Sequence, residues 1–565
     1  MLLNKNDDIE LHIDSVSLTG SGVGRYNGLA VFVPATAPGD FIKAHIIKAK
    51  KSYAVGKCTK IIKPSPDRTD NDCPTYPGCG GCSFRHMSYN AELKLKSDAV
   101  RDAFSRIGGL DVELKPIIGA DSPDGYRNKA QYPVAVKKGR AYAGFYRAGT
   151  HDVVENARRS HRIVDCRACR LAPPEFEKIL GTVADWIEKY NISVYDETSR
   201  SGAVRHIYLR KAFATGEIML CLVSAEENLP HIDKLIESLK DEKAIKSILV
   251  NINPDDTNAV LGEKCIPLLG DGCITDILCG VKVRISPLSF YQVNRAQAEK
   301  LYKKAAEYAG DKKTKLLLDL YCGAGTIGLS MADKTEELIG IETVAPAIED
   351  AKKNAAANGI ENARFICADA GEAAEKLLRE GKRPEVIVLD PPRKGCSEQT
   401  IRAAAKMAPD RIVYVSCDPA TLARDCAVFK ELGYEVEEAT PVDLFPRTAH
   451  VETVVLLSHK KADSYIHIDV EFGEGEGKIP VDSIAKRAEA YKPKEKVTYK
   501  MIKEYIEAKY GFKVHTAYIA EVKRNLGLPM YDAPNAVEEL KQPRKHPTPE
   551  KVEAIKDALR YFAVI

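Results

Sequence analysis

The segment YVSCDP, residues 414–419, places a cysteine where a strand meets a turn. Tyr414 and Val415 are typical of a buried strand, whereas Pro419 cannot continue a sheet and directs the chain toward the surface. Cys417 is therefore expected at the edge of a sheet, as a small buried residue, a metal ligand or a nucleophile. Burial is the usual fate of an unpaired cysteine, so the neighbouring motifs are needed to distinguish these three roles of Cys417.

A glycine-rich turn lies about a hundred residues upstream. LLLDLYCGAGTIGL, residues 316–329, predicts a strand, a turn and a helix, and Gly323, Gly325 and Gly328 satisfy the pattern G-x-G-x-x-G. Glycines let the backbone approach a ligand, and Glu342, at the end of the next predicted strand, could accept hydrogen bonds from ribose hydroxyls. These residues predict a nucleotide-like ligand, and at this point NAD and S-adenosylmethionine fit equally well.

Two further segments bring polar side chains to the same predicted edge. VIVLDPPRKG (386–395) places Asp390 at the carboxyl end of a strand, where ligands bind in open α/β sheets, and two prolines stiffen the following loop. An acidic residue followed by two prolines is typical of methyltransferases that act on nucleobases, and dinucleotide dehydrogenases have no use for it. LFPRTAHVETVVLL places His450 and Glu452 at the start of another strand. Cys417 is then expected to face the same crevice.

A thiol, a carboxylate and a methyl donor together suit the methylation of uracil. Carbon 5 of uracil is too weak a nucleophile to take a methyl group from a sulfonium, but addition of a thiolate at carbon 6 makes carbon 5 enolate-like. A base must then remove the proton at carbon 5 so that elimination releases the enzyme. With Asp390, the glycine turn and Glu452 around it, Cys417 is better explained as a nucleophile than as a buried residue.

Repeated strand and helix patterns would hold these residues in place. From about residue 290 the chain reads LLLDLY then IGLSMAD, LIGIE then AIEDAKKNAAANG, EVIVLD then EQTIRAAAKM, and RIVYVSC then PATLARDCAVFKELG. This alternation predicts a parallel sheet with helices on both faces.

The preceding part of the chain has a different pattern. Residues 8–62 alternate in short β-like runs, with GSGVGRYNG as a glycine-rich turn between the first two, and they predict a small barrel. A helix is expected at 91–106, and 126–285 mixes strands with a helix or two. Several lysines crowd the last barrel strands and suit either RNA binding or a solvated face: Lys43, Lys48, Lys50 and Lys51.

The bulk properties narrow the class of protein. A chain of 565 residues is too long for one core, so several domains are expected. The net charge of +3 gives no argument for nucleic-acid binding, which has to rest on local patches. No apolar run approaches the ~18 residues that cross a bilayer, and the N-terminus lacks a signal peptide's basic start. We expect a cytoplasmic protein without a membrane partner, whose 15 cysteines serve metal binding or catalysis rather than disulfides.

One group of cysteines has the spacing of a metal site. CPTYPGCGGC brings Cys73, Cys79 and Cys82 together among glycines and prolines, which predicts one metal centre. A fourth ligand must come from elsewhere, and DCRAC offers Cys166 and Cys169. Spacing alone favours zinc, because four thiolates form a common closed zinc site, and thiolates also bind iron–sulfur clusters.

Six motifs in this order resemble those of the RNA uracil-5-methyltransferases, and in particular the bacterial 23S ribosomal RNA enzymes with an iron–sulfur cluster. They are YQVN, DLYCGAGTIGL, GIE, LDPPRKG, YVSCDPATLARD and LFPRTAHVE. The resemblance covers residues 1 to about 460. It implies S-adenosylmethionine as the methyl donor, bound by Gln292, Tyr321, Gly323, Glu342 and Asp390.

The resemblance also implies roles for the remaining site residues. Cys417 would be the nucleophile, Glu452 the base, and Phe290 would lie near the target uracil, where an aromatic face suits a flipped base. The metal centre would be a [4Fe–4S] cluster. Cys169 is preferred to Cys166 as its distant ligand, because family members have their cysteine just before a Leu-x-Pro-like stretch, here RLAPPEF. The implied ligands are Cys73, Cys79, Cys82 and Cys169.

The expected architecture is an α/β protein with a Rossmann-like S-adenosylmethionine-dependent methyltransferase domain at 286–460. A TRAM-like, OB-like β-barrel would fill 1–62, and a central mixed α+β domain with the cluster would fill 63–285. A linker and a small helical accessory domain would fill 461–565. The tail resembles a helix-turn-helix with basic residues, and both an RNA-binding accessory and a solvated charged face remain open.

The predicted function is methylation of uridine at carbon 5 in 23S ribosomal RNA by a monomeric enzyme, through a covalent adduct between Cys417 and carbon 6. Ribosomal RNA is preferred to transfer RNA by family analogy only. An alternative from another class is a nucleotide-dependent iron–sulfur oxidoreductase that uses the glycine turn for NAD. A non-catalytic RNA-binding protein is a third, and the presence of both Cys417 and Glu452 argues against it.

Overall fold

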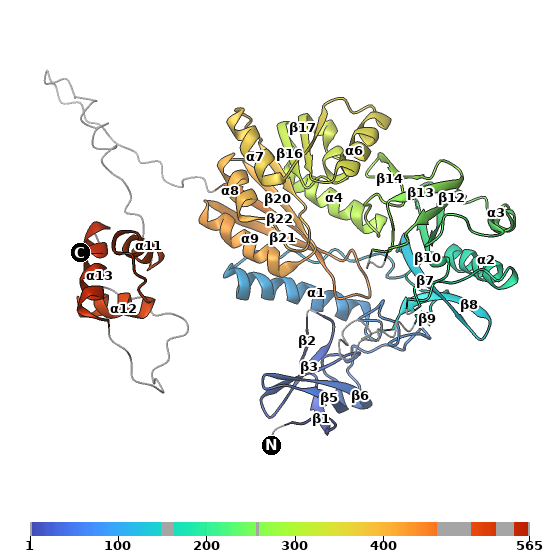
Figure 1. Ribbon diagram of the computed structural model, residues 1–565, viewed down its shortest axis with the longest axis horizontal. Helices are drawn as coiled ribbons and strands as arrows, with labels where there is room; N and C mark the ends of the chain where they lie inside the picture. The colour runs from blue at the N-terminus through green and yellow to red at the C-terminus, as the bar shows by residue number, and fades with distance from the viewer. Residues whose placement is uncertain are drawn as a thin grey trace. The chain divides into compact units, whose positions relative to one another are not determined.

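The computed structural model describes residues 3–17, 19–147, 163–197, 199–255, 259–459, 499–526 and 547–562. The chain divides into two compact units, Met1–Asp463 and Ser464–Ile565 (Figure 1). Among the described residues, no helix combines the length and apolar character that crossing a membrane requires. The linker predicted after residue 460 lies outside the described residues.

The N-terminal strands form one sheet of order β1-β5-β6-β4-β3-β2. Alternate residues of β5 are buried, as expected for a sheet with one face on a core. The predicted turn GSGVGRYNG is mostly a strand, and that expectation was wrong. Gly24 lies so close to the first strand that a Cβ atom would fall 2.0 Å from the His12 carbonyl oxygen, so the glycine marks close strand packing. The strands are β1 (Asp8–His12), β2 (Ser15–Val16), β3 (Gly22–Tyr26), β4 (Leu29–Val33), β5 (Phe41–Ala49) and β6 (Tyr53–Lys63).

A second sheet has the order β13-β12-β11-β10-β7-β8-β9. Helix α2 (Glu175–Lys189) packs the apolar side chains of Phe176, Ile179 and Val183 into the same core as β7, β10 and β11. Helix α3 (Ile232–Leu239) precedes β12, and a separate hairpin of β14 (Ile274–Leu278) and β15 (Val281–Ile285) follows the sheet. The strands are β7 (Lys129–Lys137), β8 (Arg140–Tyr146), β9 (Ile163–Asp165), β10 (Val204–Lys211), β11 (Ile218–Ser224), β12 (Ile245–Ile252) and β13 (Lys264–Leu269).

The third sheet is the predicted α/β layer, with the order β18-β17-β16-β19-β20-β22-β21. Neighbours from β18 to β20 run parallel, whereas β22 lies antiparallel to both β20 and β21. Its bounds are β16 (Thr314–Leu320), β17 (Thr335–Glu342), β18 (Ala363–Cys367), β19 (Val386–Leu389), β20 (Arg411–Ser416), β21 (Tyr434–Val442) and β22 (Glu452–His459).

Helices cover both faces of this sheet, as the sequence predicted. Leu316, Leu318 and Leu320 share one core with α7, α8 and α9, while Leu317 shares the other with α4, α5 and α6. After the glycine turn, α5 has only four residues and a short 3-10 turn follows, so the predicted helix there is shorter than expected. The helices are α4 (Arg295–Ala309), α5 (Thr326–Leu329), α6 (Ala345–Ala357), α7 (Ala370–Arg379), α8 (Glu398–Lys406) and α9 (Pro419–Glu431).

Helix α1 (Tyr89–Ala103) lies between the cysteine-rich segment and the second sheet in sequence, but it packs on the third sheet's core. Val100, Ala103 and Phe104 belong to the hydrophobic cluster formed by α7, α8 and α9. The helix begins at a Ser88 cap, whose side chain accepts a hydrogen bond from the Ala91 amide.

The C-terminal unit has its own core. Helices α11 (Tyr499–Tyr510), α12 (Thr516–Asn525) and α13 (Pro549–Tyr561) bury Ile506, Ile519 and Ile555 against one another. The helix, turn and helix predicted for this tail are therefore confirmed for α11 and α12.

Candidate active site and cysteine pocket

Cys417, Glu452, Asp390, Glu342 and the glycine turn lie at one edge of the third sheet. Strands β16, β17, β19 and β20 run parallel, so their carboxyl ends lie at the same edge, and antiparallel β22 begins there. Ser416 pairs with Thr453 across β20 and β22, which places Cys417 and Glu452 one position further along, on neighbouring strands. The backbone register therefore brings together a thiol and a carboxylate that are 35 positions apart in the sequence.

The glycine turn and Glu342 form the lobe predicted to bind a nucleotide. The Gly323 amide donates a hydrogen bond to Glu342 Oε2 (3.2 Å) and the Val344 amide donates to Oε1 (2.9 Å). Gly325 caps α5 with a positive φ of 80°, and an added Cβ would fall 3.1 Å from the Phe365 ring, so only glycine suits this position. The carboxylate is thus held at the strand end where a ribose is expected.

Two carboxyls with raised pKa values lie close to this lobe, Asp319 within β16 and Asp390 directly after β19. Burial raises the pKa of Asp319 to about 8, and the charges of Asp390 and Glu342 raise it further. The hydrogen bond from the Gly328 amide (3.0 Å) acts in the opposite direction and lowers this pKa. Among the described residues, Asp319 Oδ1 has no hydrogen-bond partner although it is buried. Burial also raises the pKa of Asp390 to about 7. Carboxyls perturbed by burial in this way are common at functional sites.

Cys417 directly follows β20 and precedes Asp418, the residue that caps α9. Asp418 caps α9 by accepting hydrogen bonds from the Ala420 and Thr421 amides (2.9 and 3.0 Å), and Pro419 occupies the first helical turn. Burial raises the pKa of the Cys417 thiol to about 11, with the charges of Glu452 and Asp390 acting in the same direction. The thiol is therefore protonated in the free protein at neutral pH.

Glu452 has the environment of a base that works near neutral pH. Its side chain is buried, and this burial together with the charge of Asp390 raises its pKa to about 8. The Arg393 guanidinium lowers the pKa of both Glu452 and Cys417. A carboxyl that ionises near pH 8 can both accept and return a proton under cellular conditions.

Of the remaining predicted residues, Phe290 and Gln292 lie on the loop between β15 and α4, Tyr321 directly follows β16, and His450 precedes β22. The Phe290 side chain is 64% exposed, so its ring is available for stacking. Gln292 is buried, and its backbone carbonyl accepts a hydrogen bond from Asn128 Nδ2 (2.8 Å). Tyr321 adopts a positive φ of 68°, and its hydroxyl donates to Thr400 Oγ1 (3.3 Å). His450 is exposed, with its ring 5.9 Å from that of Phe445.

Two site residues were not singled out from the sequence. Arg393 is part of the LDPPRKG motif itself, and a cation beside a predicted thiol and carboxylate was a signal that could have identified it. Asp319 stands inside the otherwise apolar strand LLLDLY, and a charged residue within a buried strand was the corresponding signal.

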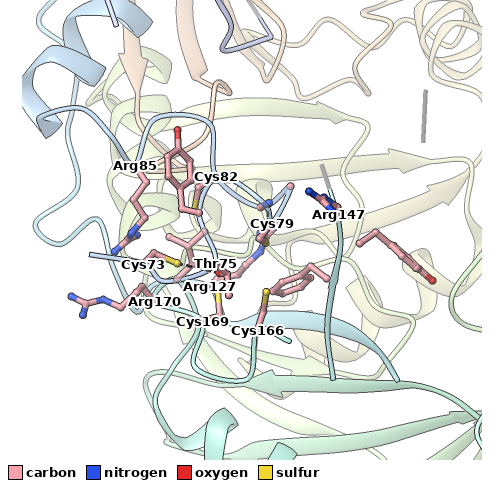
Figure 2. A pocket seen from close by; sticks show the side chains of 16 residues that line it. Cys73, Thr75, Cys79, Cys82, Arg85, Arg127, Arg147, Cys166, Cys169 and Arg170 are labelled. Atoms are coloured by element: carbon pink, nitrogen blue, oxygen red, sulfur yellow. Dashed lines mark hydrogen bonds between the residues drawn. The ribbon is translucent and has the colours of Figure 1, made fainter. Parts of the chain in front are cut away.

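The four cysteines of the predicted metal centre and Cys166 line one pocket of about 420 Å³ (Figure 2). Both Cys166 and Cys169 reach it from the segment after β9, opposite the loop of Cys73, Cys79 and Cys82. Four arginines line the same pocket: Arg85, Arg127, Arg147 and Arg170. Within the described ranges, no three ligand side chains are gathered closely enough to hold a metal ion as they stand.

The thiols in this pocket differ in their electrostatic state. A hydrogen bond from the Cys166 thiol lowers the pKa of Cys79, while the same bond and burial raise that of Cys166. Burial raises the pKa of Cys82 to about 12, and Cys169 acts on both Cys79 and Cys82 by its charge. The distant cysteines thus interact with both ends of the C-x2-C pair.

The predicted RNA-contacting lysines are exposed on β5 and on the turn that leads to β6. Lys43 Nζ lies 3.9 Å from Asp8 Oδ2, with both side chains about half exposed (50% and 51%). The exposed lysines are Lys43, Lys48, Lys50 and Lys51.

Comparison with known proteins agrees with this arrangement. A family model described as tRNA (uracil-5-)-methyltransferase matches residues 281–460, and a TRAM domain model matches residues 5–59. RNA methyltransferases of Clostridium tetani and Clostridium acetobutylicum are 43% and 44% identical to the chain over 458 and 459 residues. These matches cover 81% and 80% of this chain and 97% and 98% of those proteins.

A solved structure supports the same fold. The Pyrococcus abyssi tRNA (uracil-54, C5)-methyltransferase, solved with S-adenosyl-L-homocysteine, is 28% identical with a TM-score of 0.63, covering 80% of this chain and 100% of that one. The predicted α/β fold of S-adenosylmethionine-dependent methyltransferases, with an N-terminal TRAM domain, is confirmed. The alternative of an iron–sulfur oxidoreductase is correspondingly disfavoured. The chain belongs to the tRNA (uracil-5-)-methyltransferase family of RNA methyltransferases.

Proposed function

We propose that the protein transfers a methyl group from S-adenosylmethionine to carbon 5 of a uridine in 23S ribosomal RNA, through a covalent adduct between Cys417 and carbon 6. The observation that supports this most is the placement of Cys417 beside Glu452, at the strand edge that also carries the glycine turn and Glu342. We further propose that Gln292, Tyr321, Gly323, Glu342 and Asp390 surround the methyl donor.

In the first step, Cys417 gives its proton to solvent and the thiolate adds to carbon 6 of the uracil ring, which shifts the C5–C6 π electrons onto the carbon 4 carbonyl as an enolate. The high pKa of the free thiol means that deprotonation has to accompany substrate binding, and Arg393 favours the thiolate. Phe290 offers an exposed ring on which the flipped base can stack. S-adenosylmethionine, when bound, supplies the methyl group that the enolate-like carbon 5 attacks.

In the second step, Glu452 takes the proton from carbon 5. The electron pair of that C–H bond re-forms the C5–C6 double bond, and the C6–S bond breaks to release Cys417 as the thiolate. Because Glu452 ionises near pH 8, it can accept this proton and later return it to solvent.

The two residues should therefore fail at different steps. Cys417→Ala should bind RNA and cofactor but form no adduct, whereas Glu452→Gln should accumulate a methylated protein–RNA adduct on a denaturing gel. Wild-type enzyme given RNA with 5-fluorouridine at the target should also form a stable adduct, because fluorine cannot leave as a cation. An adduct in Cys417→Ala would mean that another cysteine is the nucleophile.

The proposal also specifies which class of RNA is methylated. The Pyrococcus abyssi neighbour acts on transfer RNA, so transfer RNA is the alternative substrate. Mapping 5-methyluridine in both ribosomal and transfer RNA from a deletion strain distinguishes them, and loss from transfer RNA alone would overturn the ribosomal assignment.

We also propose that the cysteine pocket holds a [4Fe–4S] cluster on Cys73, Cys79, Cys82 and Cys169. Five thiols in one pocket supply the thiolate ligands that such a cluster needs, and the neighbouring arginines suit its negative charge. Cys169 is preferred to Cys166 because it stands just before RLAPPEF, the Leu-x-Pro-like stretch that follows the ligand cysteine in the family that the chain resembles. A cluster here would shape the RNA-binding region, because methyl transfer requires no electrons.

Metal analysis of anaerobically purified protein tests this assignment. We expect brown protein with about four irons, loss of iron in Cys169→Ser and retention in Cys166→Ser. Stoichiometric zinc without iron would contradict the cluster. Loss of iron in Cys166→Ser and retention in Cys169→Ser would identify Cys166 as the fourth ligand instead.

A further inference from the structure

The segment that leads to Glu452 is held by side chains and backbone groups from distant parts of the chain. We call residues 443–451, between β21 and β22, the base loop. Each backbone carbonyl from Asp443 to Arg447 accepts a hydrogen bond from a distant part of the molecule. The donors are Gln297 for Asp443, Asn294 for Leu444, Lys96 for Phe445, Tyr126 for Pro446, and the Ser83 and Phe84 amides for Arg447.

A buried ion group lies at the centre of these contacts. Lys96 on α1 is 2% exposed, and its ammonium donates to Glu92 Oε1 and Asp443 Oδ1, both at 2.7 Å, and to the Phe445 carbonyl at 3.1 Å. Glu92 and Asp443 are fully buried. The three hydrogens of the ammonium therefore have three acceptors, two of which belong to the base loop.

Each of the two carboxylates also accepts a hydrogen bond that links α1 to the base loop. Asp443 Oδ2 accepts a hydrogen bond from the Tyr89 hydroxyl at 2.6 Å, and Glu92 Oε1 accepts one from the Arg447 amide at 2.7 Å. Tyr89, Glu92 and Lys96 project from α1, so one helix holds the base loop at Asp443, Phe445 and Arg447.

A buried ion group of this kind adds little net free energy to folding stability. Desolvation of an ion pair offsets most of its attraction, and well-packed apolar residues often serve equally well, whereas a buried ionic network can fix one arrangement in preference to others. The base loop needs such fixation, because its residues form neither helix nor strand. The loop also ends directly at Glu452, whose carboxylate must reach one proton on the bound base.

We propose that Lys96 is a positioning residue for Glu452, acting through Asp443 and the Phe445 carbonyl to hold the base loop. The inference rests on the proposed function, since it assigns Lys96 to the proton-removal step. Lys96 and Asp443 are separated by 347 positions, so the contact also makes α1 part of the catalytic framework.

The test removes the ammonium without a change in net charge, and Asp443 keeps the hydrogen bond from the Tyr89 hydroxyl. In Lys96→Met with Glu92→Gln, one positive and one negative charge disappear together, and the amide oxygen of the introduced glutamine can still accept from the Arg447 amide. The control is Lys382→Met with Glu337→Gln, which removes a partly exposed ion pair of 2.6 Å near the amino end of β17 in the same sheet. S-adenosylhomocysteine and RNA affinities measure whether each variant is folded.

The expected result is a defect confined to release of the adduct. Affinities for S-adenosylhomocysteine and RNA should stay within about two-fold, while decay of the methylated adduct should slow by roughly 10-fold to 100-fold, the range that misplacement by about 1 Å costs. The control variant should decay at the wild-type rate. Decay in the Lys96 variant within two-fold of the control, or a loss only in RNA affinity, would overturn the inference.

A milder variant covers the case in which the double substitution does not fold. Tyr89→Phe removes only the hydrogen bond to Asp443 Oδ2 and the one from the Ala120 amide, and it should slow the same step several-fold. An unchanged decay rate in Tyr89→Phe would then refute the inference. Failure of the wild-type enzyme to trap 5-fluorouridine RNA would instead refute the proposed function, so the two outcomes are distinct.

Discussion

Elimination from the methylated adduct should depend on pH through the ionisation of Glu452. Burial and the charge of Asp390 place the pKa of this carboxyl at about 8, and only the ionised form can take the carbon 5 proton. By that value roughly one-tenth of the protein carries the ionised base at about pH 7 and roughly nine-tenths at about pH 9. The decay rate should therefore rise about ten-fold between these pH values and level off above them.

A single-turnover experiment isolates this step. Enzyme, RNA and S-adenosylmethionine are mixed, the reaction is stopped with denaturant at successive times, and the adduct is followed on a denaturing gel across the pH range. Thiolate addition has its own pH dependence, because burial holds the Cys417 pKa near 11, but it affects only the appearance of the adduct. Its decay reports Glu452.

Two variants sharpen the measurement. Asp390→Asn removes the charge that helps to raise the pKa of Glu452, so the inflection of the decay rate should move to lower pH. Methyl transfer precedes the decay, so weaker cofactor binding in that variant leaves the inflection unaffected. A decay rate that does not change between pH 7 and pH 9 in the wild type, or that keeps its inflection in Glu452→Gln, would refute the assignment of the base.

Three further predictions concern other parts of the molecule. Arg393→Gln should move the decay inflection to higher pH, because the guanidinium lowers the pKa of Glu452; an inflection at unchanged or lower pH would contradict this. A protein truncated after residue 462 should retain S-adenosylmethionine binding and some activity, since the C-terminal unit has a separate core; loss of cofactor binding would contradict it. Neutralising the exposed TRAM lysines should weaken RNA binding uniformly and flatten its salt dependence, and an unchanged salt slope would identify a solvated face. Those lysines are Lys43, Lys48, Lys50 and Lys51.

The parts of the fold that depend on local pattern were predictable. Apolar runs such as EVIVLD and RIVYVSC are buried strands, and the motifs at their ends lie at the expected edge. The position of Glu452 at the first residue of β22 was also predicted, because the apolar run VVLL follows it closely.

Contacts between distant segments were not predictable in this way. The packing of α1 on the third sheet and the bonds of Lys96 to the base loop depend on tertiary structure, which no window of local sequence contains. Glycine in β3 was mistaken for a turn signal, because close strand approach and turn formation select the same residue. The preference for Cys169 over Cys166 stays a prediction, since both side chains line the pocket.

The antiparallel placement of β22 has a consequence for protein engineering. Cys417 and Glu452 are neighbours through strand register, so buried residues of β22 such as Val454 and Leu457 help to fix the register that brings the two together. A slip of β22 by one residue would exchange the two faces of the strand and carry the carboxylate away from the thiol. Selecting variants in which β22 packs well between β20 and β21 should therefore also enrich active enzymes, even without a screen for methylation.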